Sequence, residues 1–257
     1  METAKTLRAR YKTEKRSARK AYRAKKREIK ENYGERLSEY RGAEISASDP
    51  PRRSVLEETG NAITHGAGAL LSVAAFVLML VASDTREKTF SAIVYFIGLF
   101  FAFGFSCLYH SFRYGSKVKR LFRRFDYSSI YLLIGATYTP ILLCFLGGVY
   151  GKVFCAVQWA VIITGVTFVG VFGPAKLRPL HFTLYIILGW SALLFLPKMI
   201  SGNFPLFLFV LSGGVIYSLG IIPFAMNKKV SHFLWHFFVL FGAVLQWIGV
   251  YFYIYLA

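Results

Sequence analysis

The chain has 257 residues, of which 55% are hydrophobic and only 17% are charged. A soluble domain of this length usually carries about a quarter charged residues, so the composition excludes an ordinary soluble globular protein. The charge is also uneven, because residues 1–61 hold 17 of the 31 lysines and arginines and 10 of the 13 acidic residues. The apolar remainder predicts a multispan membrane domain.

The N-terminal arm, residues 1–54, is dense in charge. Glutamates and basic residues recur at spacings that can pair along a helix, but apolar residues are too sparse to form a core. We expect a solvated helix or a disordered arm. Binding to anionic lipid headgroups is the main alternative, since the segment is basic and adjoins the first span. No motif supports nucleic-acid binding. Asp49-Pro50-Pro51 ends any helix and marks the linker to the membrane domain, residues 55–257.

A membrane span needs about 20 mainly apolar residues. The hydropathy pattern predicts an all-α fold, a bundle of seven transmembrane helices. No cleavable signal peptide is expected, because residues 1–50 contain no apolar stretch typical of one. The expected spans are 62–82, 91–111, 126–146, 153–173, 180–200, 204–224 and 232–255.

The basic residues predict the orientation. With seven spans, the N-terminus shares a side with the loops 112–125, 174–179 and 225–231, which together hold 10 lysines and arginines, against 4 in the loops and span ends of the other side. The positive-inside rule then places the N-terminus in the cytoplasm.

Polar groups gather where the spans meet the cytoplasmic face. Glu58, Asn61 and His65 are spaced so that they share one face of the first helix. A polar stripe that enters lipid must face protein rather than acyl chains. Ser106 and His110 are neighbours at the end of the second span.

A zinc site is predicted from three histidines. His232 and His236 are separated by three residues, so their imidazoles point the same way from one helix, about one turn apart. His110 ends another span at a matching depth and can supply a third ligand. Three protein nitrogens with an open fourth position are typical of catalytic zinc, which lowers the pKa of a bound water to about 7.

Asp126 is the only acidic residue between Lys88 and the C-terminus. It enters the third span from the same side, which makes it the expected base or orienting group for the zinc-bound water. Ser106 could hydrogen-bond that water, Asp126 or the substrate. The alternative is that Asp126 is a helix N-cap or an ion-pair partner of Arg123 or Arg124.

The histidines also have structural interpretations. A pair of histidines at this spacing is a weak signal alone, and such a pair is as often structural as metal-bound. We expect His181 to be an interfacial or hydrogen-bonded residue rather than a ligand. The neighbouring Asn61 and Glu58 favour a helix contact by hydrogen bonding for His65, although ligation is an alternative.

Four motifs together resemble the progestin and adipoQ receptor/hemolysin III superfamily, over about residues 55–257, and the ending around His232 is similar to its bacterial hemolysin III branch. The resemblance implies seven helices with the N-terminus inside and a location in the bacterial plasma membrane. It also implies Zn²⁺ on the residues matching His110, His232 and His236. The motifs are Glu58-Thr59-Gly60-Asn61-x-x-Thr64-His65, Ser106-x-x-x-His110, Asp126-Tyr127-Ser128 and His232-x-x-x-His236.

Three functions remain open. The first hypothesis is a zinc-dependent intramembrane hydrolase of lipid amides, an activity that the superfamily resemblance implies. The second is a pore-forming or membrane-lysing protein in which zinc is structural, as the hemolysin III name implies. The third is a receptor, which would need an external ligand, and the short outer loops offer little surface for one. Membrane lipids are the expected partners.

Overall fold

The structure is a computed structural model that describes residues 4–48, 50–226 and 228–257, with the backbone alone for residue 5 and residues 35–48. The chain divides after residue 49 into two units, and each is described by itself.

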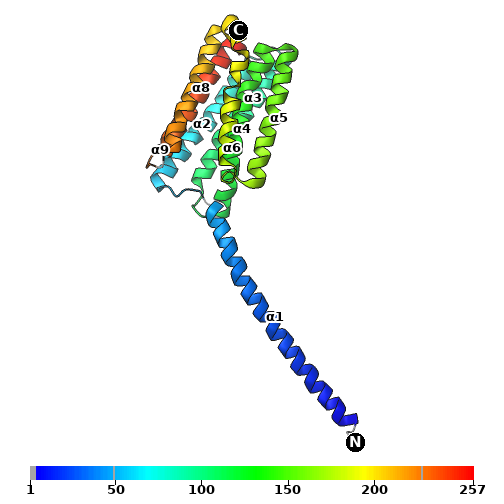
Figure 1. Cartoon of the computed structure of the whole chain (residues 1–257). Helices are drawn as coiled ribbons and strands as arrows, with labels where there is room; N and C mark the ends of the chain where they lie inside the picture. Colours follow the sequence, from blue (N-terminus) through cyan, green and yellow to red (C-terminus); the bar gives the residue numbers. More distant parts are fainter. Residues whose placement is uncertain (1–3, 49, 227) are drawn as a thin grey trace. The chain divides into compact units, whose positions relative to one another are not determined.

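The first unit is a single helix, α1 (Ala4–Ser48) (Figure 1). Its described side chains are exposed. Pairs such as Arg10 with Glu14 (3.4 Å) and Arg27 with Glu31 (2.9 Å) bridge successive turns, as the sequence predicts. Because these pairs are solvent-exposed, each contributes little stability. The described side chains of α1 form no core of their own.

Residues 50–226 and 228–257 of the second unit contain seven helical segments long and apolar enough to cross a membrane, which confirms the predicted fold class. They comprise α2 (Val55–Val81), α3 (Arg86–Ser111), α4 with η1 (Lys117–Pro140, Ile141–Leu146), α5 (Gly148–Phe172), α6 with η2 and α7 (Arg178–Gly189, Ser191–Phe195, Leu196–Gly202), α8 (Phe204–Ala225) and α9 with η3 (Ser231–Val250, Tyr251–Tyr255).

Two helices begin well before the expected apolar boundary. The side chain of Ser54 accepts a hydrogen bond from the Glu57 amide and caps α2, and that of Ser116 accepts one from the Lys119 amide and caps α4. Capping lets each helix start in a polar segment. Consequently Asp126, at the edge of the apolar run, lies on the third turn of α4 rather than at the helix start.

Three of these spans contain a segment that is not α-helical, and the last of them ends in the π-helical turn η3. Pro140 lacks the amide that an α-helix needs, and α4 gives way there to the π-helical turn η1, where a kink was expected. The fifth span is broken into α6, the 3₁₀ turn η2 and α7, with Pro197 near the start of α7.

Close packing at small residues holds the bundle together. α2, α3 and α4 pack in sequence, α8 packs on α9, and α2 contacts α9. A Cβ added at Gly98 of α3 would overlap Ala136 of α4, and one at Gly165 of α5 would overlap the Tyr131 ring. Such small residues let membrane helices approach closely. Successive spans alternate in direction, so the starts of α2, α4, α6 and α9 meet the end of α3 at one face of the bundle.

The sidedness of this bundle remains a prediction from the loop charges. In a variant without native cysteines, Lys117→Cys at the start of α4 should resist a membrane-impermeant thiol reagent in intact cells. Ser201→Cys in α7, at the other face, should react. Both positions are exposed, so burial does not account for a difference. The opposite labelling pattern would place the N-terminus outside.

Candidate metal centre

Three histidines from two helices form a cluster. His110 comes from the last turn of α3, and His232 and His236 come from the first two turns of α9. One ring nitrogen from each lies within 4.8 Å of the others, so the three residues can hold one metal ion. His110 and His236 are buried, and His232 is half-buried. The structure therefore brings together the three residues that were predicted to share a metal.

The geometry of the cluster fits such an ion. The Nε2 atoms of His232 and His236 are 3.3 Å apart. Two nitrogens bound tetrahedrally to zinc at about 2.0–2.1 Å would be separated by roughly the same distance. In addition, Nε2 of His110 is buried and has no hydrogen-bond partner among the described residues. A buried ring nitrogen left unpaired is costly unless it binds something.

Glu58 and Lys119 fix the orientation of His110. Glu58 Oε2 accepts a hydrogen bond from His110 Nδ1 at 2.5 Å, which leaves Nε2 as the free nitrogen. Glu58 Oε1 in turn lies 3.0 Å from the ammonium nitrogen of Lys119. That nitrogen also donates to the carbonyls of Tyr109 (3.0 Å) and Phe112 (3.1 Å) at the end of α3. Lys119 is only 1% exposed, so all three of its donors are used inside the protein.

Lys119→Met should therefore weaken the metal site without touching a ligand. The substitution leaves Glu58 as an unpaired carboxylate, and breaking one side of a buried pair costs about 3–5 kcal/mol. We expect a lower melting temperature and a roughly 10–100-fold loss of metal affinity, the scale for residues that orient a ligand. Lys117→Met, an exposed change on the same helix, is the matched control. Equal effects of the two substitutions on metal affinity would refute this role.

Asn61 and His65 complete the predicted polar stripe of α2. Asn61 Nδ2 lies 3.3 Å from His110 Nδ1, so it packs on the nitrogen that faces Glu58. The His65 ring stacks on that of His236 with centroids 3.8 Å apart. The hydrogen bonding expected of His65 is wrong, because neither of its ring nitrogens has a hydrogen-bond partner among the described residues. Its ring contacts α9 by stacking instead, beside the three-nitrogen cluster rather than within it.

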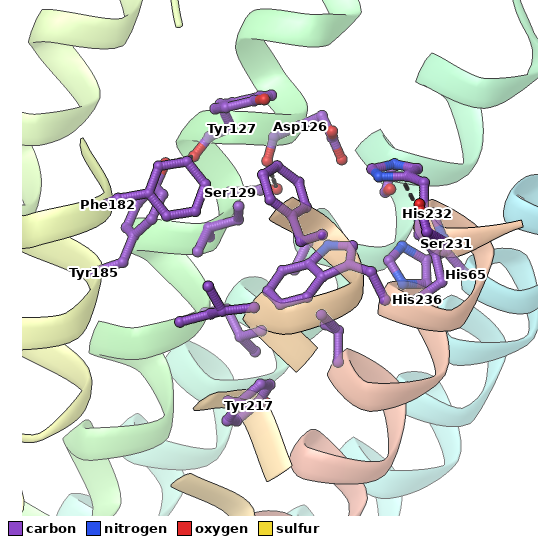
Figure 2. A pocket seen from close by; sticks show the side chains of 18 of the residues that line it. His65, Asp126, Tyr127, Ser129, Phe182, Tyr185, Tyr217, Ser231, His232 and His236 are labelled. Carbon is purple, nitrogen blue, oxygen red and sulfur yellow. Dashed lines mark hydrogen bonds between the residues drawn. The ribbon is translucent and has the colours of Figure 1, made fainter. Parts of the chain in front are cut away.

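Asp126 and Ser106 lie at the same end of the bundle. Ser106 is buried and within hydrogen-bonding reach of the Asp126 carboxylate. Asp126 and the two histidines of α9 line one cavity (Figure 2). The helix N-cap interpretation of Asp126 is wrong, because Ser116 caps α4.

His181 stands apart from the cluster. It is fully buried near the start of α6, and its Nδ1 lies 2.9 Å from the hydroxyl of Tyr131 on α4. The histidine therefore has the hydrogen-bonded structural role that was expected of it, and it is not among the three that can share an ion.

A cavity of about 820 Å³ opens beside the cluster. Its polar wall includes Asp126, His232 and His236, while residues such as Tyr185 and Tyr217 line its other walls (Figure 2). Segments from α2, α3, α4, α6, α8 and α9 contribute to it. The cavity was not predicted from the sequence, because its lining residues lie far apart along the chain.

Basic side chains surround part of this cavity. Arg53 lines it, and its Nη1 is buried without a hydrogen-bond partner among the described residues. Arg178 also lines it, with its guanidinium 5.6 Å from the Phe182 ring and 5.7 Å from the Phe224 ring. From the sequence, Arg53 was recognised only as part of the charged N-terminal arm and Arg178 only as a loop charge that sets the orientation.

The family model described as haemolysin-III related matches residues 53–247. The chain belongs to the haemolysin III family. It is 37% identical over 208 residues to Hemolysin-3 of Bacillus cereus, covering 78% of this chain and 93% of that relative. It is 32% identical over 206 residues to the Hemolysin-3 homolog of Bacillus subtilis (strain 168), covering 78% of this chain and 95% of the relative. These bacterial relatives and the seven apolar helices support a multi-pass integral protein of the plasma membrane.

Proposed function

We propose that this haemolysin III family member is a zinc-dependent intramembrane hydrolase of lipid amides. One observation carries the proposal: a cluster of three histidines that can hold an ion adjoins a large cavity, and a carboxylate lines that same cavity. Hydrolytic metal sites need an open position beside the protein ligands, and the cavity provides space there.

Each residue has a defined part in this proposal. His110, His232 and His236 would hold Zn²⁺, which supplies Lewis-acid activation of water and of a carbonyl group at neutral pH. Asp126 accepts the proton of the attacking water and returns it to the leaving amine. Ser106 holds the Asp126 carboxylate in place, and Glu58 keeps Nε2 of His110 free for the metal.

The cavity is suited to a lipid. Its volume of about 820 Å³ falls within the range of small-molecule sites, and side chains such as Leu133, Ile186 and Ile221 provide apolar lining for an acyl chain. Arg53, which lies 3.8 Å from Glu57, and Arg178 line the same cavity, and they favour a head that carries negative charge.

The test is release of fatty acid from N-acyl lipids by the purified protein in bilayers. We expect turnover that a zinc chelator abolishes and that added zinc restores. An inactive protein that nevertheless contains one zinc per chain would contradict the proposal. The substrate panel should include N-acyl amino acids, whose carboxylate can pair with the arginines.

A membrane-lysing protein with a structural metal is the second candidate. It is favoured by the names of the relatives, Hemolysin-3 and Hemolysin-3 homolog. In that case the purified protein should lyse erythrocytes, and an exchange of Asp126 should leave lysis unchanged.

A further inference from the structure

The helix α1 lies outside the segment that matches the family, residues 53–247. It nevertheless carries a regular pattern that the proposed hydrolysis does not use. The large apolar side chains of its described part are between 48% and 69% exposed, so most of their surface is uncovered within the helix's own unit. They are Leu7, Tyr11, Tyr22, Ile29 and Tyr33.

These side chains form one stripe. Tyr11, Tyr22 and Tyr33 recur every 11 residues, and Leu7 and Ile29 each precede a tyrosine by four. Eleven residues complete almost three helical turns, so each tyrosine returns to nearly the same face. At about 100° per residue, all five lie within a sector of roughly 80°. We call these five residues the tyrosine stripe.

The described glutamates are absent from one side of the tyrosine stripe, although basic residues occur all round the helix and Lys15 and Lys25 fall within the sector of the stripe. On the same count of about 100° per residue, Arg8, Lys12, Arg19, Lys26 and Lys30 lie along one flank of it. We call these five residues the basic flank.

The acidic side chains of the described part of α1 lie on the other side of the stripe, and each pairs within the helix. Glu14, Glu28 and Glu31 pair with Arg10, Lys25 and Arg27 at 3.4, 3.0 and 2.9 Å. The basic flank takes no part in these three pairs, so its charge is available for an external anion.

We propose that α1 lies along an anionic lipid surface with the tyrosine stripe and the basic flank towards the headgroups. Tyrosine is favoured at the boundary between headgroups and acyl chains. Basic residues beside the stripe are attracted to anionic lipids, and the glutamates face water. Only residues 49–54 separate α1 from α2, the first candidate span, so the chain tethers the C-terminal end of α1 to a membrane domain.

A second copy of α1 fits these observations less well. Packing two tyrosine stripes together would bring two basic flanks close to each other, and like charges repel. The stripe also holds only five large apolar side chains in 27 residues, from Leu7 to Tyr33, fewer than a continuous coiled-coil seam requires.

Spin labels on the full-length protein test this binding. With Cys107, Cys144 and Cys155 replaced by alanine, one label is placed at Tyr22→Cys in the stripe and another at Ala24→Cys, roughly opposite. In nanodiscs of phosphatidylcholine with phosphatidylglycerol, the label at position 22 should lose access to a water-soluble relaxation agent several-fold, while that at 24 keeps it. In phosphatidylcholine alone, or at high salt, both should stay accessible.

Charge variants give a matched control. Arg19→Gln with Lys26→Gln and Lys30→Gln should restore access at position 22. Arg10→Gln with Lys20→Gln and Arg27→Gln removes as much charge away from the basic flank and should do so far less. Equal effects of the two triple variants would overturn the proposal. So would a label at position 22 that remains accessible in anionic discs, or spin–spin broadening that reveals paired helices. None of these outcomes depends on lipid-amide turnover.

Discussion

Each of three single substitutions should remove most of the zinc from the purified protein. They are His110→Ala, His232→Ala and His236→Ala. Two imidazoles cannot complete the site, so the affinity should fall by more than the roughly 10–100-fold lost when only an orienting residue is changed. The melting temperature should fall too, because a ligand at 100 times its Kd stabilises the folded state by about 2.7 kcal/mol. Metal content is measured by mass spectrometry and stability by thermal unfolding.

His181→Ala is the control for these three substitutions. It also removes a buried imidazole, one that is hydrogen-bonded to Tyr131 instead of lying in the cluster. We expect it to lower stability while leaving the zinc content unchanged. Full zinc content in any one of the three cluster variants would show that its histidine is not a ligand.

Asp126→Asn should separate metal binding from catalysis. The three imidazoles remain, so zinc should stay bound. The amide cannot accept a proton from water, and turnover should fall by roughly 10²-fold or more, the scale of a lost general base. Zinc content and fatty-acid release are measured on the same preparation.

Ser129→Ala is a matched control on the same helix. Its hydroxyl donates to the Asp126 carbonyl at 2.7 Å, so the change is close to Asp126 but spares the carboxylate. We expect this variant to keep most of the activity. An Asp126→Asn protein as active as the Ser129→Ala protein would exclude Asp126 as the base.

The sequence predicted the number of spans and the pair of histidines on α9 because both depend on local periodicity. Apolar runs define the helices, and the spacing of His232 and His236 puts both on one face of α9. His110 was assigned to the same site only because it lies at the same depth in the membrane. That assignment is possible because spans alternate in direction, so the end of the second span and the start of the seventh lie at one face.

The helix starts were harder to predict. Ser54 and Ser116 cap their helices within polar segments, where hydropathy gives no signal. As a result, the sequence did not show that α4 has two turns before Asp126.

The support for the metal site could not be predicted because it depends on tertiary contacts. Lys119 is one of several basic residues in a short segment, and nothing local distinguishes it from Lys117. Its burial follows from the meeting of Glu58 on α2 with the end of α3. The cavity likewise depends on six helices that only the folded bundle brings together.

The most direct test of the zinc-hydrolase account is a titration of the metal-free protein in bilayers with zinc, following lipid-amide turnover and bound metal together. The account predicts turnover that rises in proportion to bound zinc and reaches a plateau at one zinc per chain. Turnover that is independent of bound zinc, or a fully loaded protein that releases no fatty acid, would contradict it.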